Sequence, residues 1–286
     1  MKKVAVVCAK GIGDGLTWMV MAHNLSINGY KVVVYSDILS EIDCCFPSIT
    51  ILPFISDIAS LNTFDLIVSD DHSHVLEQKK LIITELLIPR EHFFDRRVQR
   101  IDNILKVLSG YFDIHTSLKD NGIACPFQGQ KSYKHVAIHP TASDIERNWG
   151  KNRYKKLAEK IVKMGFTVSF IMRKDEVDQW SDIDILGVSI FGFKDLLQTA
   201  EHISKSNYFI GSDSGIGHLA SNLGIPTVSI FVRKSHSLNW RPGWSDGIVV
   251  SPINIVPTRY LRLRVWRSLI TVGMITRAFK NLVNST

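Results

Sequence analysis

The sequence has no apolar run long enough to cross a membrane. Hydrophobic residues make up 45% of its 286 residues and charged residues 21%, a composition typical of soluble globular proteins. No stretch approaches the roughly 20 apolar residues of a membrane-spanning helix. The opening "MKKVAVVCAKGIGDG" has only six consecutive apolar residues, too few for the core of a signal peptide. We therefore expect a globular protein whose first residues form a β-strand.

Cysteine is scarce as well. The four cysteines are Cys8, Cys44, Cys45 and Cys125. They show no C-x-x-C spacing, and the adjacent Cys44 and Cys45 could bridge each other only with strain. The sequence therefore predicts no disulfide framework, and a reducing cytoplasm is the simplest setting for the protein.

Acidic residues are missing from residue 247 to the end, where six basic residues carry nearly all of the net charge of +7. These are Arg259, Arg262, Arg264, Arg267, Arg277 and Lys280. Apolar residues recur there at spacings of three and four, as in Leu263, Trp266, Ile270 and Met274, so residues 259–286 are predicted to form a basic amphipathic helix. Its apolar stripe either packs on the protein, where we expect the amino-terminal domain, or lies on an anionic membrane surface, and the two are compatible.

The rest of the chain alternates short β-branched runs with helical segments, which is typical of an α/β fold. In the first half we expect strands at 3–9, 31–36, 49–54, 64–70 and 80–86, and helices at 15–28 and 96–109. After a turn-rich linker at 117–134, we expect strands at 135–140, 166–172, 208–212 and 227–231, and helices at 152–165, 193–206 and 217–224.

The continuous apolar character of these strands indicates parallel sheets buried on both faces. We therefore predict two doubly wound domains, residues 1–125 and 126–258, followed by the basic helix. Such sheets bind ligands at the carboxyl ends of their strands, and two facing domains would enclose a cleft.

The motif "GSDSGIGHLA" at 211–220 follows one of these strand ends. Asp213 comes just past the strand, and Ser214 and Gly215 open the next helix. Free backbone N–H groups and the positive end of that helix predict an anion site, with His218 as a further hydrogen-bond donor. The alternative is that Asp213 or Ser214 is an ordinary N-cap and that His218 is a satisfied helix residue.

A second motif, "HPTASDIERNW" at 139–149, follows the first strand of the second half. It delivers the hydroxyl of Thr141 and the guanidinium of Arg147 to the same edge of the sheet, and the planar fork of arginine suits phosphate. On its own, Arg147 would be a solvated loop residue. After the strand at 166–172, Asp175 and Glu176 either reach a ribose hydroxyl or begin a solvated helix.

The third motif is "CAKGIGDGLTWMV" at 8–20. With Asp37 after the next strand, it resembles a dinucleotide fingerprint, but position 16 is leucine, and Asp14 occupies a turn where it would repel a pyrophosphate. A carboxylate on this turn is better suited to take a proton from an attacking hydroxyl. Helix capping by Asp14 is the alternative. The residues "DDHSH" at 70–74 are too weak a pattern to predict a metal site.

Taken together, the three motifs resemble those of the family 9 glycosyltransferases, the heptosyltransferases that build the inner core of bacterial lipopolysaccharide. The family's G-D turn is similar to "GIGDG", its strand-end loop to "HPTASDIERNW", and its D-[TS]-G-x-x-H-x-A helix start to "DSGIGHLA". The resemblance implies a GT-B fold of two Rossmann-like domains facing a central cleft. It also implies an inverting transfer from ADP-heptose without a metal or cofactor, with the donor on the carboxyl-terminal domain and the acceptor on the amino-terminal one.

By this resemblance, Asp14 is the general base, Gly13 and Gly15 bind the acceptor, and Arg147 stabilises the departing diphosphate. The donor-binding residues are then Thr141, Glu176, Asp213, Ser214, Gly215 and His218. Ser214 stands where the family more often has threonine, and the amino-terminal half is shorter than usual. The implied acceptor is a lipopolysaccharide core on the cytoplasmic face of the inner membrane. Alternatives are another nucleotide sugar, a protein acceptor, a nucleotide-sugar epimerase, or an NAD-binding domain without transferase chemistry.

Overall fold

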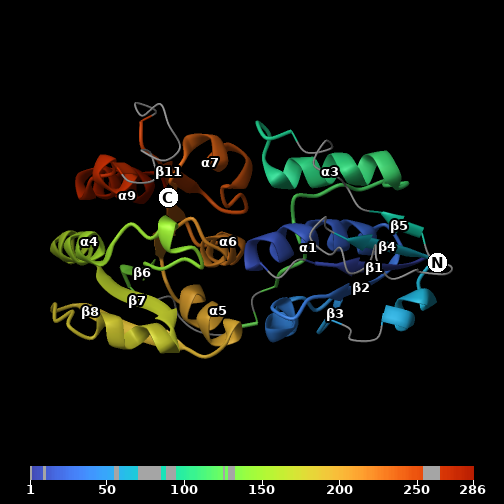
Figure 1. Ribbon diagram of the computed structural model, residues 1–286, viewed down its shortest axis with the longest axis horizontal. Helices are drawn as coiled ribbons and strands as arrows, with labels where there is room; N and C mark the ends of the chain where they lie inside the picture. The colour runs from blue at the N-terminus through green and yellow to red at the C-terminus, as the bar shows by residue number, and fades with distance from the viewer. Residues whose placement is uncertain are drawn as a thin grey trace. The chain divides into compact units, whose positions relative to one another are not determined.

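The computed structural model describes residues 2–8, 11–54, 58–69, 85–87, 95–124, 126–127, 133–253 and 265–286. The chain forms two compact units, Met1–Pro126 and Phe127–Thr286. Each unit contains one parallel sheet with helices packed on it (Figure 1). The two sheets confirm the predicted α/β class.

The first unit has a five-stranded parallel sheet in the order β3-β2-β1-β4-β5. Its strands are β1 (Lys3–Val7), β2 (Lys31–Tyr35), β3 (Thr50–Leu52), β4 (Leu66–Ser69) and β5 (Glu85–Leu87). Its helices are α1 (Ile12–Ile27) and α3 (Arg100–Tyr111), with short 3₁₀ turns η1 (Leu39–Cys45) and η2 (Ile58–Thr63). Val4 to Val7 of the central strand are buried, as a strand covered on both faces requires.

The second unit has a six-stranded parallel sheet in the order β11-β10-β9-β6-β7-β8. Its strands are β6 (His135–His139), β7 (Thr167–Arg173), β8 (Val188–Phe193), β9 (Tyr208–Ser212), β10 (Thr227–Ile230) and β11 (Gly247–Val250). Its helices are α4 (Lys151–Lys163), α5 (Leu196–Ser204), α6 (Gly215–Asn222), α7 (Lys234–Trp240) and α9 (Val272–Ser285), with 3₁₀ turns η4 (Ile145–Arg147) and η5 (Lys174–Trp180). Viewed from β8 to β11, this is the strand order of a doubly wound dinucleotide-binding sheet.

The basic tail packs on the second unit, which corrects the expectation that it packs on the amino-terminal domain. Leu263 lies outside the described residues, but from residue 265 on the apolar side chains of the tail lie in the core of the second unit, and α9 contacts α4, β10 and β11. Phe279, for example, meets the rings of Phe166 and Tyr208 edge-on, with centroids 5.1 and 5.4 Å apart. The described part of the tail is also two helical segments rather than one, residues 265–269 and α9. Thr271 starts α9 as its N-cap by accepting a hydrogen bond from Met274 N at 3.2 Å.

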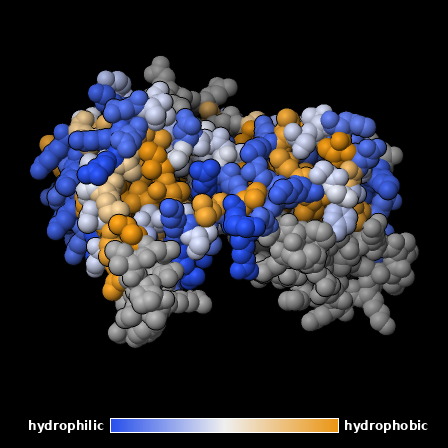
Figure 2. Space-filling view, turned by 90° about the horizontal axis from the view of Figure 1, so that it is seen from above, coloured by the Kyte–Doolittle hydropathy of each residue, from blue (hydrophilic) through white to orange (hydrophobic). Residues whose placement is uncertain are grey.

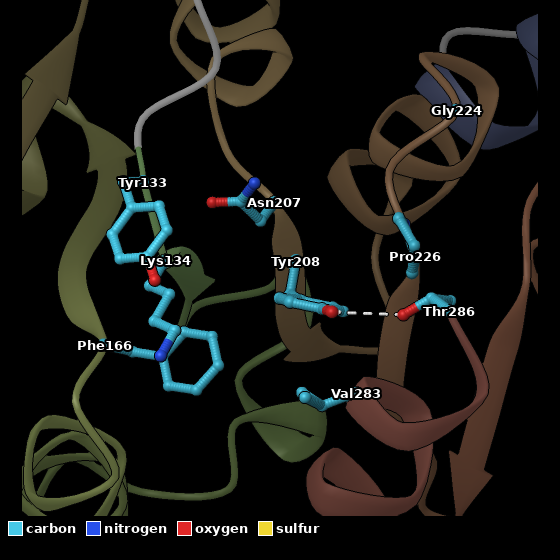
Figure 3. Close-up of a pocket in the computed structure, with 9 residues that line it drawn as sticks. All are labelled: Tyr133, Lys134, Phe166, Asn207, Tyr208, Gly224, Pro226, Val283 and Thr286. Carbon is cyan, nitrogen blue, oxygen red and sulfur yellow. Dashed lines mark hydrogen bonds between the residues drawn. The ribbon is translucent and has the colours of Figure 1, made fainter.

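A pocket of about 410 Å³ lies where the end of α9 meets the sheet. It is lined by Tyr133, Lys134, Phe166, Asn207, Tyr208, Gly224, Pro226, Val283 and Thr286 (Figure 3). Tyr208 and Thr286 share a hydrogen bond of 3.1 Å between their hydroxyls. Because Asn207 directly precedes β9 and Pro226 directly precedes β10, this pocket lies at the amino ends of the strands. Doubly wound sheets bind their ligands at the other edge.

No helix among the described residues is long and apolar enough to cross a membrane. On the face seen in Figure 2, hydrophilic side chains are interspersed with smaller hydrophobic areas. Such a mixture is ordinary for a protein surface, on which apolar atoms still contribute more than half of the exposed area.

Candidate functional site

The centre of the second sheet is its topological switch point. β6 and β9 are neighbours there; the chain leaves β6 towards β7 and β8, and leaves β9 towards β10 and β11. In doubly wound sheets the ligand binds outside the carboxyl ends of the two strands at this point. The two motifs predicted from sequence follow those strand ends: His139 to Thr141 after β6, and Asp213 to Gly215 after β9.

Asp213 is a buried carboxylate at this edge, with 6% of its surface exposed. Its Oδ2 lies 3.1 Å from His236 Nδ1 and 3.9 Å from Arg147 Nη1. Its Oδ1 is buried without a hydrogen-bond partner among the described residues. An unpaired buried oxygen is costly, and a native structure seldom keeps one without a reason. Asp213 is therefore suited to accept a hydrogen bond from a ligand hydroxyl.

The amino end of α6 lies next to Asp213 in the chain. Ser214 is the N-cap residue, and its side chain makes no cap hydrogen bond to this helix. The Ser214 hydroxyl instead lies 3.4 Å from His139 Nδ1. Ser214 thus stands at the N-cap position, as one interpretation of the sequence has it, but its hydroxyl does not cap the helix. A helix start of this kind presents backbone N–H groups and a partial positive charge, and both favour an anion.

His218 lies one turn into α6 and is buried, with 3% of its surface exposed. Its ring lies near those of Trp240 and Trp244, with centroids 5.2 and 6.2 Å away. Burial lowers the pKa of His218 to about 4, although the nearby Asp213 carboxylate acts in the opposite direction. At neutral pH this imidazole is therefore uncharged and can act only as a hydrogen-bonding group.

Arg147 ends the short 3₁₀ turn η4, which Asp144 caps by accepting a hydrogen bond from Glu146 N at 2.9 Å. The guanidinium lies 3.9 Å from each of two carboxylates, those of Asp144 and Asp213. Its side chain is 38% exposed, so these ion pairs are screened by water and weak. Because its guanidinium carries five N–H donors and is partly exposed, Arg147 can still bind a phosphate.

Thr141 and Glu176, predicted separately from two strand ends, are brought together. The Thr141 hydroxyl donates to Glu176 Oε2 at 3.2 Å, and the same oxygen accepts from Arg173 N at 3.0 Å. Glu176 belongs to η5, which follows β7 directly. Asp175 instead forms an exposed ion pair with Arg173, at 2.8 Å.

In the first unit, Asp14 lies in the first turn of α1, and its carboxylate covers Gly11. A Cβ on Gly11 would lie 2.8 Å from Asp14 Oδ2. Gly13 and Gly15 are both buried, and a Cβ on Gly15 would lie 3.0 Å from the Leu39 side chain. Packing within the first unit thus accounts for Gly15, and acceptor binding by Gly13 and Gly15 stays a prediction.

Two alternatives from the sequence concern this unit. Asp37, the acid of the dinucleotide fingerprint, accepts a hydrogen bond from Phe54 N at 2.8 Å and so ties the ends of β2 and β3 together. The "DDHSH" stretch at 70–74 lies outside the described residues. Within the described part of the chain, no three histidine, cysteine or carboxylate side chains are grouped so that they could hold a metal ion.

Three aromatic or basic side chains of the site were not predicted from the sequence: His236, Trp240 and Trp244. They lie in and after α7, which follows β10, the strand next to β9. A usable signal was present, because each strand of a parallel sheet sends its next residues to the same edge. The stretch "FVRKSHSLNWRPGW" after β10 contains all three.

The chain is similar to proteins of one known family. The family model described as "Glycosyltransferase family 9 (heptosyltransferase)" matches residues 98–257. The "Lipopolysaccharide heptosyltransferase 3" of Escherichia coli (strain K12) is 25% identical over 123 residues. That alignment spans 40% of this chain and 35% of the relative.

Solved structures show the same fold. A family 9 glycosyl transferase from Veillonella parvula DSM 2008 superposes with a TM-score of 0.77 at 15% identity, covering 100% of this chain and 98% of that one. The E. coli heptosyltransferase WaaC with ADP gives 0.73 at 10% identity, covering 98% and 99%. The E. coli ADP-heptose lps heptosyltransferase II gives 0.73 at 13% identity, covering 99% of each chain. The fold is thus GT-B, and because the family model covers more than half of the chain, this protein is a glycosyltransferase that belongs to family 9, the heptosyltransferases.

Proposed function

We propose that the protein transfers heptose from ADP-heptose to a lipopolysaccharide or lipooligosaccharide core acceptor with inversion at the sugar carbon. One observation supports this more than any other. Arg147, Asp213 and the uncapped start of α6 meet at the switch point of the second sheet. A cation, the amino end of a helix and a buried hydrogen-bond acceptor at one place suit a sugar linked to a diphosphate.

On the donor side, charge develops on the diphosphate as the bond to the sugar breaks. The Arg147 guanidinium and the first N–H groups of α6, at Ser214 and Gly215, would stabilise that charge. Asp213 would hold a sugar hydroxyl, and neutral His218 would add a hydrogen bond. Glu176, steadied by Thr141, would accept a hydroxyl of the nucleoside.

On the acceptor side, Asp14 would act as the general base. It takes the proton of the attacking hydroxyl while that oxygen bonds to the sugar carbon from the face opposite the leaving group. The bond from the carbon to the diphosphate oxygen breaks, and ADP leaves. Gly13 and Gly15 would keep the chain beside Asp14 compact enough for the acceptor to approach. No step requires a metal ion.

The acceptor we propose is a phosphorylated glycolipid, met at the cytoplasmic face of the inner membrane. The positive charge gathered from residue 247 onward supports this, because basic side chains attract anionic lipid surfaces. Arg259, Arg262 and Arg264 lie outside the described residues, whereas Arg277 and Lys280 are exposed on α9.

Calorimetric titration with ADP, UDP, GDP and NAD tests the donor. We expect selective ADP binding that weakens in Ser214→Ala and in His218→Ala, with far-UV circular dichroism to show that both variants are folded. A preference for UDP or GDP would replace the donor by another nucleotide sugar. NAD binding that is indifferent to both substitutions would overturn the proposal and move the site to the turn around Asp14.

A further inference from the structure

Arg267, in the carboxyl-terminal segment, holds the backbone of the loop that carries Arg147. Its Nε donates to Asn148 O at 2.7 Å, and its Nη2 donates to Ile145 O at 3.0 Å and to Glu146 O at 3.2 Å. These carbonyls lie on both sides of Arg147. One guanidinium therefore holds the peptide groups that flank the proposed phosphate-binding side chain.

The same segment makes a second attachment to the loop. Trp149 Nε1 donates to Ile270 O at 3.0 Å, and both residues are fully buried. The Arg267 guanidinium also lies over the ring of Trp266, 5.2 Å from its centroid. Arg267 thus directly follows a fully buried residue, Trp266.

The turn that carries Arg147 is itself short and poorly buried. η4 is only three residues long, and none of the three is buried. Ile145, its one large apolar side chain, is 77% exposed. Hydrogen bonds from a charged donor are stronger than neutral ones. Three of them to a short 3₁₀ turn are therefore a main determinant of where Arg147 lies.

Trp149 also connects the loop to the strand end that carries Asp213. Its ring meets that of Tyr154 edge-on at 5.2 Å, and the Tyr154 hydroxyl lies 2.8 Å from Ser212 Oγ. Ser212 directly precedes Asp213. The carboxyl-terminal segment is thus linked, through contacts in the core, to both partners of the 3.9 Å pair between Arg147 and Asp213.

We propose that Arg267 is a positioning residue of the donor site. It holds the loop at 145–148 so that the Arg147 guanidinium stays beside Asp213, in place for the donor diphosphate. Arg267 reaches the reaction only through Arg147. That Arg147 is placed for a donor diphosphate rests on the function proposed above, whereas the hold of Arg267 on the loop concerns the structure alone.

Hydrogen exchange of the loop amides tests the structural half. The Arg147 and Asn148 amides donate to Asp144 O and Ile145 O at 2.9 and 3.1 Å. We expect both to exchange at least tenfold faster in Arg267→Ala. Arg277→Ala, which removes an equal charge from the exposed face of α9, should leave them unchanged. Arg267→Lys should be intermediate, because a single ammonium lacks the fork that spans three carbonyls. Unchanged protection in a folded Arg267→Ala protein would overturn the proposal.

Transfer kinetics in a double-mutant cycle test the functional half. We expect Arg267→Ala to lower kcat/KM roughly a hundredfold, the loss that misplacing a group by about an ångström can cause. In an Arg147→Ala background the same change should cost less than about threefold, since its effect has already been lost. Equal losses in both backgrounds would show that Arg267 does not act through Arg147. If the wild-type protein neither binds ADP nor transfers sugar, the proposed function fails, and exchange alone decides whether Arg267 holds the loop.

Discussion

His139 and His218 are buried imidazoles at the proposed donor site. Burial lowers the pKa of each to about 4, whereas a histidine in the unfolded chain titrates near 6.5. Between these values the unfolded state binds more protons than the folded state. The contribution of these two uncharged histidines to the free energy of unfolding is therefore complete above about pH 6.5. It is lost progressively as the pH falls towards 4.

We predict that the free energy of unfolding falls between pH 7 and pH 5, by roughly 2 kcal/mol for each of these two histidines. Urea denaturation at several pH values measures this. In His218→Gln the dependence should be shallower, whereas His115→Gln, at an exposed position, should leave it unchanged. An identical pH dependence in wild type and His218→Gln would contradict the prediction.

Asp14 is the residue on which the proposed acceptor chemistry depends. We predict that Asp14→Ala leaves ADP binding intact, since the donor residues lie in the other unit, and lowers turnover by about 10²- to 10⁴-fold, the usual contribution of a general base. Radiolabel transfer under saturating donor measures the turnover. Asp43→Asn, which changes an exposed carboxylate of η1, serves as the control. Normal turnover in Asp14→Ala would remove this residue from the mechanism.

At the scale of elements, the sequence predicted those whose pattern is set locally. β1, β2, β6, β7 and β9 are continuous apolar runs because the sheet buries both of their faces. The edge strands β8 and β11 were not predicted. β8 alternates in burial along "VSIFGF", and β11 is at least partly exposed at its first three residues, so neither is buried on both faces like a central strand.

The residues of the site also divide into those that a local sequence pattern predicts and those that it does not. Thr141, Arg147, Asp213 and Ser214 were predictable because each follows a recognisable strand end. Arg267 was not, because its partners at 145–148 lie more than 115 residues earlier in the chain, and no local pattern records such a contact. The break at Ile270 was missed for a related reason: the apolar spacing continues through it, while Thr271 restarts the helix.

Gly192 of β8 illustrates how closely elements approach around the donor site. A Cβ there would lie 2.3 Å from Val177 Cγ2 and 3.0 Å from Lys174 Cα, and both belong to η5, the turn that carries Glu176. We predict that Gly192→Ala destabilises the protein by about 1–3 kcal/mol through overpacking and weakens ADP binding by displacing η5. Urea denaturation and calorimetry measure the two effects.

Gly110, in α3, provides the matched control. Outside its own helix, no atom of the described residues lies within 4 Å of where a Cβ on Gly110 would stand. Gly110→Ala should therefore stabilise the protein by about 0.5–1 kcal/mol without changing ADP binding. If Gly192→Ala were as stable as the wild type, the close contact between β8 and η5 would be relieved by movement and would not constrain Glu176.

At the scale of the whole molecule, the carboxyl-terminal segment is part of a core and not an appendage. Trp266, Ile270, Ile275, Phe279 and Leu282 are buried in the second unit. Removing residues 259–286 would expose that core, so truncation cannot separate membrane binding from folding. Because the apolar stripe of α9 is already covered by protein, any contact of this helix with lipid has to be electrostatic.

We therefore predict that charge alone determines how α9 binds lipid. Replacing Arg277 and Lys280 by glutamine should leave the melting temperature unchanged, since both are exposed. It should weaken pelleting with vesicles containing phosphatidylserine roughly tenfold or more, at about 1 kcal/mol for each basic residue near an anionic surface. Vesicles of phosphatidylcholine alone should pellet neither protein.

The control removes the same charge from the first unit, as Lys31→Gln with Lys106→Gln, both exposed. If the protein contacts lipid through α9, this pair should bind vesicles almost as well as the wild type, because the basic side chains of α9 are intact. Equal weakening by both pairs would mean that net charge draws the protein to lipid without a preferred face. No weakening by the α9 pair would leave lipid binding, if observed, to residues outside α9.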